Sequence, residues 1–427
     1  MSVPLSLMPA QPPILVIGAG AAGMIAAWRA ASLGASVVLL ERNRKPGIKL
    51  LISGGGKCNI THAGGIEDLR SAFRPREARF LKHSFHCFTN EEIIRLIEAE
   101  RVPTFARTNG RVFPVRGKAD EVVDAILAAL QRAGARLELD ARVESLKTAD
   151  GVMQSTMVRG EERTSSHIVL ATGGVSYPKT GTTGDGITWA GALGHTIVPL
   201  RPALAPIAVT PSLPSGWRGV AIRGGCLAVY ANGTKVDEWQ GDILFTHEGI
   251  SGPAALEVSR AAALALETSE PELRLDFFPA KEYPALDGEL NDLILTERAR
   301  MIGSVLASWL PNRIVPHLLG LAGVDPGKRG HVLTREERRA IVRLLKSWTL
   351  GRVRSVPLER GEVTAGGVSL DEVDPRTMRS RKVKGLYLCG EILDIAGPVG
   401  GYNLQAAFST GFVAGETAAK DWLLQGM

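Results

Sequence analysis

The alternation of apolar and polar positions divides the chain into short buried strands and amphipathic helices. Apolar runs at 14–17 and 36–40 predict two buried strands, and the small apolar residues between about Ala22 and Leu33 predict a helix. A strand, a helix and a second strand in this order are typical of a parallel βαβ unit. The chain therefore begins with an α/β element.

The turn after the first strand carries Gly18, Gly20 and Gly23. Gly18 permits a tight turn, Gly20 lets a pyrophosphate approach the backbone, and Gly23 lets the helix pack closely on the sheet. The free N–H groups of the helix N-terminus then face the phosphates. Glu41 ends the second strand and can accept hydrogen bonds from ribose hydroxyls. This pattern predicts a bound dinucleotide with no 2′-phosphate at this site.

Further α/β elements follow on both sides of a different middle region. The sequence predicts helices at 90–100, 120–131 and 182–194, a strand-turn-strand at 136–146, buried strands at 168–174 and 385–391, and a helix from about 402 to 418. In a doubly wound sheet, ligands bind beyond the carboxyl ends of the strands. The ends of the later strands therefore belong to the same site as Gly18.

The middle region has the composition of an insertion. Five prolines between 199 and 214 precede β-rich runs around the Asn232-Gly233 turn, which predicts a small antiparallel sheet or barrel. A helical block follows, with a capping box from Thr334 to Glu337 and an apolar face that includes Trp348. We therefore predict a dinucleotide-binding domain at 1–195 and 355–427, a β-barrel-like insertion at 196–286 and a basic helical insertion at 287–354.

A glycine-rich loop at 47–59 contains three consecutive glycines. It is not a Walker A motif, because Leu51 replaces the first glycine and Cys58 replaces the Ser or Thr after Lys57. Consecutive glycines are useful where backbone must lie against a flat ligand, since a side chain would collide with it.

Composition excludes several classes of protein. The chain has 45% hydrophobic and 22% charged residues over 427 positions, as expected for a globular protein of more than one domain. The longest apolar stretch contains the glycine turn, so no membrane span is predicted, and Met1 to Pro13 has the character of a loose tail and not of a signal peptide. Four scattered cysteines indicate a reducing, cytoplasmic setting. His62, His195 and His247 have no second ligand at metal spacing, so no metal site is predicted.

Positive charge is concentrated late in the middle region. The formal net charge is +6, and the segment 298–360 holds thirteen Lys or Arg against four acidic residues. This density is enough to attract a polyanion such as RNA. A solvated helix surface without a partner explains the same charges, and the sequence leaves both interpretations open.

Six blocks of the sequence closely resemble the BaiN/RdsA-type FAD-dependent oxidoreductases, a family also described as aminoacetone oxidase-like flavoproteins. The matching blocks are 18–23 with Glu41, 49–61, 171–186, 244–253, 377–380 and 390–405. The resemblance spans nearly the whole chain and implies FAD, a discontinuous Rossmann-like FAD-binding domain, and an inserted β-barrel and helical domain. Lys57 stands where many relatives have Arg, and Ile48 occupies a position that is often basic, so a direct Arg contact there is not expected.

The resemblance also implies which residues hold the cofactor. They fall into groups for the pyrophosphate, the adenosine end, the ribityl chain and flavin, the strand ends and the pyrimidine edge. The pyrophosphate group is Gly18, Gly20, Ala22 and Gly23, and the adenosine group is Glu41, Arg42 and the backbone of Val143. The group along the ribityl chain and flavin is Lys49, Ser53, Gly54, Gly56, Lys57, Cys58 and Asn59. The strand-end group is Ala171, Thr172, Gly173, Gly390 and Glu391, and the group at the pyrimidine edge is Asn403, Leu404 and Gln405.

The chemistry expected from such a protein is hydride transfer. Reduced flavin delivers hydride, and the protein orients an acceptor and supplies a proton, for which Cys58, Tyr177 and Tyr402 are the candidates. Only one dinucleotide fingerprint is present, so NADH or NADPH is expected to dock transiently as electron donor. The resemblance implies, as the leading hypothesis, a reductase of a conjugated C=C bond, such as uracil in ribosomal RNA, with hydride added at C6 and a proton at C5. The alternatives are a small-molecule flavin dehydrogenase or amine oxidase, and an FAD-bearing RNA-binding protein without catalysis.

Overall fold

Five parallel strands form the central sheet of the first of two structural units. Their order is β19-β10-β1-β2-β6, and each neighbouring pair is parallel. The bounds are β1 (Ile14–Ile17), β2 (Val37–Leu40), β6 (Arg136–Glu138), β10 (Ile168–Leu170) and β19 (Leu386–Leu388). All residues of β1, β2, β10 and β19 are buried, as expected for a sheet covered on both faces.

The computed structural model describes residues 11–426. The predicted N-terminal tail, 1–13, therefore lies almost entirely outside the described residues. Helices of the first unit are α1 (Ala21–Ser32), α2 (Ile48–Gly56), α3 (Ile66–Ser71), α4 (Pro75–Cys87), α5 (Asn90–Ala99), α6 (Ala119–Arg132), α7 (Asp185–Ala192) and α13 (Tyr402–Gln425). The last helix extends well past the predicted end at Ala418, because the residues that follow carry no glycine or proline until Gly426.

Two local predictions in this unit are wrong. The strand-turn-strand at 136–146 is not a hairpin, since β6 joins the parallel sheet while β7 (Val143–Ala149) pairs with β8 (Val152–Val158). The segment 47–59 is not simply a loop, because Ile48 begins a helix that Ser53, Gly54 and Gly55 interrupt with non-helical backbone angles.

Small sheets complete the first unit. The strand β9 (Glu161–Thr164) extends the β7-β8 pair, and a second small sheet has the order β3-β5-β4, with β3 (Thr61–His62), β4 (Thr104–Ala106) and β5 (Arg111–Pro114). The strands β11 (Ile197–Ala203) and β18 (Val363–Val368) pair where the chain leaves this unit and where it returns.

A closed barrel forms the second unit. The strand order is β12-β15-β14-β13-β16-β17, with β12 (Ile207–Thr210), β13 (Ala221–Ala231), β14 (Thr234–Phe245), β15 (Gly249–Ser251), β16 (Glu272–Asp276) and β17 (Trp348–Ser355). The Asn232-Gly233 turn joins β13 and β14 as predicted. Helices of this unit are α8 (Pro253–Ala265), α9 (Tyr283–Thr296), α10 (Ile302–Leu306), α11 (Val315–Leu321) and α12 (Arg335–Lys346).

The helical block interrupts the barrel. The sixth barrel strand, β17, follows α12, so Trp348 begins a strand and does not extend the helix as predicted. The two units comprise Met1–Leu200 with Val363–Met427, and Arg201–Glu362. The predicted α/β class, with a discontinuous Rossmann-like unit and an inserted barrel and helices, is confirmed. The three domain boundaries drawn from the sequence remain predictions.

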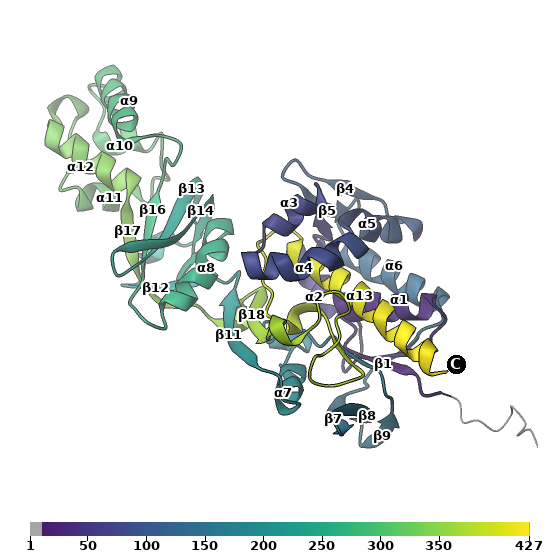
Figure 1. Cartoon of the computed structure of the whole chain (residues 1–427). Helices are drawn as coiled ribbons and strands as arrows, with labels where there is room; N and C mark the ends of the chain where they lie inside the picture. Colours follow the sequence, from purple (N-terminus) through teal and green to yellow (C-terminus); the bar gives the residue numbers. More distant parts are fainter. Residues whose placement is uncertain (1–10, 427) are drawn as a thin grey trace, which may run out of the picture. The chain divides into compact units, whose positions relative to one another are not determined.

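Closely packed helices α1 and α13 anchor the first unit (Figure 1). An added Cβ on Gly411 would lie 2.3 Å from the carbonyl oxygen of Ala22, and one on Gly415 would lie 2.1 Å from that of Ala26. These distances leave no space for any side chain. The small residues of both helices therefore allow direct contact of their backbones.

We expect Gly415→Ala to lower the free energy of unfolding by about 1–3 kcal/mol, because the added methyl group overpacks this contact. Gly288→Ala is the matched control, since Gly288 also lies within a helix but has no atom near its would-be Cβ. The control should stabilise its helix by roughly 0.5–1 kcal/mol. Calorimetric unfolding of both variants measures the difference, and equal effects would contradict this account of the contact.

Candidate functional site

The glycine turn after β1 is determined by backbone contacts. An added Cβ on Gly18 would lie 2.6 Å from the carbonyl oxygen of Ala171, and one on Gly23 would lie 1.8 Å from that of Gly18. Gly18 also has a φ of 100°, which disfavours other residues. The protein itself thus requires glycine at both positions, and the turn is held against the end of β10.

Gly20 has no such reason to be glycine. No heavy atom lies within 4 Å of its would-be Cβ, and its φ of −83° is accessible to any residue. It is the N-cap of α1, which has no side-chain cap, so the first amides of the helix remain available to a ligand. An uncapped helix start with open space before it fits a pyrophosphate, which is the group predicted for Gly18, Gly20, Ala22 and Gly23.

The acidic residue Glu41 is buried at the end of β2. One carboxylate oxygen accepts the Ala19 N–H at 2.8 Å, and the other accepts the backbone and side-chain N–H groups of Asn43, each at 2.8 Å. Burial raises the pKa of the Glu41 carboxyl, although the Asn43 and Ala19 bonds oppose the shift. A carboxylate has about four acceptor positions, so capacity remains for a ribose hydroxyl.

Arg42 and Val143 are the other two residues predicted at the adenosine end. Arg42 follows Glu41 in the sequence, and a backbone hydrogen bond links Glu41 to the segment just before Val143. Arg42 pairs with Asp185 at 3.1 Å and donates to Thr183 at 2.6 Å, so its guanidinium already has partners. The backbone carbonyl of Glu41 accepts the N–H of Ala141, which places the chain just before Val143 beside the end of β2. This geometry supports a role for the Val143 backbone at the adenosine end.

The glycine-rich segment at the end of α2 has an unusual backbone. Gly54, Gly55 and Gly56 all have positive φ, and so does Cys58, whose φ is 52°. No protein atom lies within 4 Å of the would-be Cβ of Gly55, so this position has space for a flat ligand. Lys57 is exposed, whereas Cys58 is fully buried.

The Cys58 thiol is held in its protonated form. Burial raises its pKa to about 11, and a hydrogen bond with the Ser53 side chain lowers it by less. Asn59 beside it belongs to the protein framework. With its amide oriented to satisfy both ends, Nδ2 donates to the Thr61 carbonyl at 3.1 Å and Oδ1 accepts the Gly401 N–H at 3.0 Å. Asn59 therefore ties the glycine-rich segment to the start of α13.

An ion pair joins segments that are far apart in the sequence. Lys49 Nζ lies 2.6 Å from Glu391 and also donates to Ser176 at 2.8 Å. The Thr364 N–H donates to the same Glu391 carboxylate at 2.8 Å. Four segments thus meet at Glu391, which brings the predicted residues Lys49 and Glu391 together. Ser176 and Thr364 were not among the predicted site residues, since the 171–186 block assigns no role to Ser176 and Thr364 lies outside every motif.

The end of β10 carries a buried polar atom without a partner. Thr172 Oγ1 has no hydrogen-bond partner within the described part of the chain, and Ala171 before it is buried. A buried hydroxyl in this state usually has an unseen partner, such as a ligand or water. This observation supports the predicted approach of 171–173 to the cofactor.

The start of α13 offers backbone groups and not side chains. The Asn403 side chain bonds the backbone of Gly397 and Pro398, and the buried Gln405 side chain bonds Thr61, Phe88 and Ser409. The backbone N–H of Gln405 donates to the Gly401 carbonyl, so it is not available to a cofactor. Of the groups predicted for the pyrimidine edge, the backbone amides of Asn403 and Leu404 in the first turn of the helix remain. Gly390 packs against Ala22 of α1, since an added Cβ on Gly390 would lie 2.8 Å from the Ala22 Cβ.

The two tyrosine candidates differ in setting. Tyr402, the first residue of α13, stacks on His62 with ring centroids 4.8 Å apart, and Phe73 contacts it edge-on. Tyr177 is exposed and has a left-handed backbone, with φ at 50°. Tyr402 is therefore held rigidly next to the start of α13, whereas Tyr177 is less constrained by packing.

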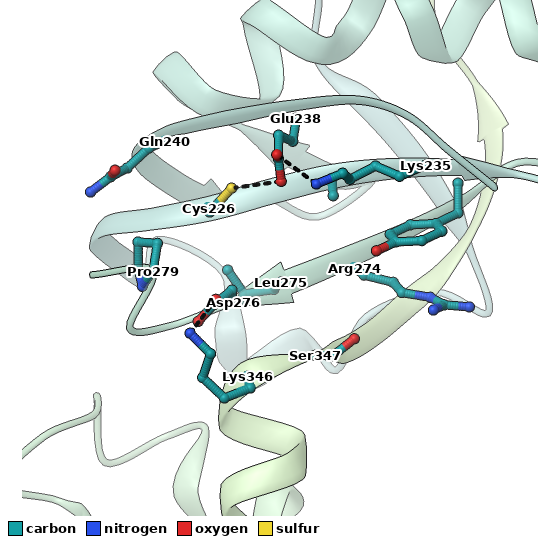
Figure 2. Close-up of a pocket in the computed structure, with 12 residues that line it drawn as sticks. Cys226, Lys235, Glu238, Gln240, Arg274, Leu275, Asp276, Pro279, Lys346 and Ser347 are labelled. Atoms are coloured by element: carbon teal, nitrogen blue, oxygen red, sulfur yellow. Dashed lines mark hydrogen bonds and ion pairs between the residues drawn. The ribbon is translucent and has the colours of Figure 1, made fainter. Parts of the chain in front are cut away.

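A groove of about 490 Å³ lies on the barrel, in the second unit, which holds none of the predicted cofactor residues (Figure 2). Its charges are largely neutralised, since Lys235 pairs with Glu238 at 2.6 Å and Lys346 pairs with Asp276 at 2.6 Å. Arg274 covers the ring of Tyr230 at 4.1 Å. Burial raises the pKa of Cys226 in this groove, and the Glu238 carboxylate adds to the shift. The groove therefore has no strong preference for an anion or a cation.

The histidines bond protein groups. The buried His195 contacts the Ala190 carbonyl and Ser380 Oγ, and burial lowers its pKa. Among residues 11–426, no group of three or more His, Cys, Asp or Glu side chains is arranged to hold a metal ion.

In that same range, no helix has both the length and the apolar character needed to cross a membrane.

Comparison with known proteins identifies relatives along nearly the whole chain. Residues 12–417 match the family model described as HI0933-like protein Rossmann domain. The chain is 31% identical to the ribosomal RNA dihydrouridine synthase of Escherichia coli K12, with 94% of this chain and 96% of that protein covered. It is 30% identical to the 3-dehydro-bile acid delta(4,6)-reductase of Clostridium scindens, with coverage of 95% and 98%.

A solved structure with the same fold is the 3-ketosteroid delta1-dehydrogenase of Sterolibacterium denitrificans in complex with 1,4-androstadiene-3,17-dione. The TM-score is 0.51 at 15% identity, with 97% of this chain and 100% of that chain covered. At this identity the likeness concerns the fold alone.

We expect Gly20→Thr to abolish FAD retention and leave the apoprotein folded. Threonine accepts the backbone angles of Gly20 and can cap α1, but its side chain fills the open space before the helix. The measurement is flavin absorbance per purified chain together with thermal unfolding of the apoprotein. Gly23→Thr is the contrasting variant, because it collides with Gly18 and should destabilise the fold itself. Full flavin content in Gly20→Thr would contradict a pyrophosphate site here.

We expect Glu391→Ala to lower the free energy of unfolding by about 1–3 kcal/mol, because it leaves Lys49 and the Thr364 N–H without their acceptor in a partly buried place. Asp371→Ala is the control, since its pair with Arg76 is exposed and its loss should change stability by less than about 0.5 kcal/mol. Denaturant unfolding of both variants without FAD tests the difference. Equal values would show that the Glu391 cluster does not hold the segments together.

Proposed function

The chain belongs to the HI0933-like Rossmann family of FAD-dependent oxidoreductases, and we propose that it reduces a conjugated C=C bond with electrons from NADH or NADPH. The proposed substrate is uracil in ribosomal RNA. The observation that carries the cofactor part is the start of α1, where Gly20 has open space before it and no side chain among residues 11–426 caps the helix.

Bound FAD supplies the hydride chemistry, and the chain supplies binding, orientation and a proton. The α1 start and Gly20 would hold the pyrophosphate, and Glu41 the ribose of the adenosine. The first amides of α13 lie at a positive helix end and would stabilise negative charge on the ring system. The Lys49–Glu391 ion pair and the hydrogen bonds of Asn59 would hold the segments that carry these backbone groups in place.

Reduction of a C=C bond adds one hydride and one proton, while NAD(P)H is oxidised to NAD(P)+. We place the proton at the Cys58 thiol, which is protonated across the physiological range because burial raises its pKa to about 11. Tyr402 is the next candidate, since its ring is fixed between His62 and Phe73 beside the start of α13.

Two relatives support the reaction class from different substrates. A dihydrouridine synthase and a delta(4,6)-reductase both carry names that denote removal of a C=C bond. The excess of positive charge in 298–360 favours RNA for this chain, because no such excess is needed for a steroid. The nearly equal identity to the bile acid reductase supports a small conjugated ketone as the second candidate.

The test is an anaerobic reaction of the FAD-loaded protein. NADH or NADPH is mixed with the protein to reduce the flavin, and then unmodified ribosomal RNA or a conjugated steroid ketone is added. Reoxidation of the flavin with formation of dihydrouridine supports the RNA proposal. Reoxidation by the ketone alone supports the second candidate, and a flavin that neither nicotinamide reduces would contradict both.

We expect Cys58→Ala to slow reoxidation of the reduced flavin by substrate by about 10²–10⁴-fold, the usual range for loss of a positioned proton donor. The rate of flavin reduction by the nicotinamide should change little, because that step needs no proton from Cys58. Cys87→Ala is the control, as Cys87 is a half-buried thiol on the helix α4. Unchanged reoxidation in Cys58→Ala would remove the thiol from the reaction and leave Tyr402 as the candidate.

A further inference from the structure

The positive charges of the segment 298–360 fall into two classes in the structure. Six of the thirteen Lys and Arg residues form ion pairs with acidic side chains, namely Arg300, Lys328, Arg338, Lys346, Arg352 and Arg360. The other seven have no acidic side chain within 4 Å in the part of the chain that the structure describes. Only the second class has charge fully available to an outside partner.

Three of the unpaired arginines lie on one helix in a regular row. Arg335, Arg339 and Arg343 are four residues apart on α12, and all three are exposed. Residues four apart lie on the same face of a helix, about 6 Å apart along its axis. The same helix also carries Ile341, Val342 and Leu345, which are buried in the core of the second unit. We call Arg335, Arg339 and Arg343 the arginine row.

The acidic residues near the arginine row do not neutralise it. Asp287 is close enough to influence Arg335 and Arg339 electrostatically, but both of its oxygens are bonded to Arg338. Glu337 is bonded to Lys328. Glu336 remains as one exposed negative charge on the helix. Since α12 holds five basic and two acidic residues, its net charge is about +3 by direct count.

We propose that the arginine row is the phosphate-docking surface for a structured RNA substrate. A solvated helix surface is stabilised when opposite charges are mixed at a spacing of four residues, whereas three like charges at this spacing repel one another. A polyanion offsets this repulsion, and each guanidinium can bind a phosphate through two hydrogen bonds. Phosphate contacts position an RNA without reading its sequence, which leaves selection of the base to the reaction site.

This inference rests on the proposed function for the identity of the polyanion. The test uses the full-length, FAD-loaded protein and a fluorescent fragment of unmodified ribosomal RNA, with the dissociation constant measured over a range of salt concentrations. The variant R335Q/R339Q/R343Q should lower the slope of log affinity against log salt by about 2–3, because three phosphate contacts are lost. At about 0.1 M salt its affinity should fall on the order of 10- to 100-fold.

A matched control removes the same amount of charge elsewhere. The variant R300Q/R352Q/R360Q also loses three positive charges from the same segment, but its arginines are exposed and already paired with Glu297, Glu270 and Glu248. We expect its salt slope to stay within about one unit of the parent value. A third variant, R335K/R339K/R343K, keeps the charge and should retain the slope, since each lysine still neutralises a phosphate.

The outcomes are separable from the fate of the proposed reaction. Flavin reduction by NADPH and thermal unfolding should be unchanged in all three variants, which confirms that each is folded and loaded. An equal loss of affinity in the first variant and the paired-arginine control would overturn the arginine row, as would a parent protein whose RNA binding does not depend on salt. Binding to vesicles of anionic phospholipid with no binding to RNA would also overturn it. Loss of binding in the first variant alone supports the row even where no dihydrouridine forms.

Discussion

Direct contact between backbones is the constraint on which the rest of the structure depends. Gly23 lies against Gly18, Gly18 lies against Ala171, and the helices α1 and α13 touch through glycines of α13. These contacts fix the start of α1 against the end of β10 and bring Gly390 next to Ala22. None of these glycines has space for an added methyl group. The absence of side chains therefore allows the ends of β1, β10 and β19 to pack close to the helices α1 and α13.

Polar side chains then hold the positions that the close packing creates. The Glu391 carboxylate accepts bonds from Lys49 and Thr364, and Asn59 links the glycine-rich segment to Gly401. The buried Gln405 side chain bonds to Thr61 and Phe88 from other segments and to Ser409 of its own helix. These groups are satisfied within the protein, so the groups left for a ligand are mainly amides at helix starts and the hydroxyl of Thr172. A site of this kind recognises phosphate and ring edges through fixed backbone dipoles.

Sequence patterns predicted the elements whose signal is local. The first βαβ unit, the helix with its capping box at Thr334 and the hairpin at Asn232-Gly233 are all present, because each depends on residues close together in the chain. The hairpin of β7 and β8 was not predicted, although the Asp150-Gly151 turn that joins these strands is a local signal. The late barrel strand β17 was not predicted either, since its pairing with distant segments leaves no periodic signal. The same limit applies to the site. The residues of the glycine turn are recognisable from spacing, whereas Ser176 and Thr364 matter only because the fold brings them to Glu391.

The same distinction explains why a count of charges could not separate an RNA-binding surface from an ordinary solvated one. The thirteen basic residues of 298–360 look equivalent in the sequence, but six of them are neutralised by acidic residues, several of which lie outside the segment, such as Asp287, Glu270 and Glu248. The charge that remains is concentrated by helical periodicity, because α12 buries its apolar side and so directs Arg335, Arg339 and Arg343 outward together. Electrostatic attraction to a polyanion depends on this unpaired remainder and on its spacing. Basic residues that are spread along the sequence therefore leave a short row of three unpaired arginines on α12. The apolar residues of the same helix fix its orientation by packing into the core of the second unit.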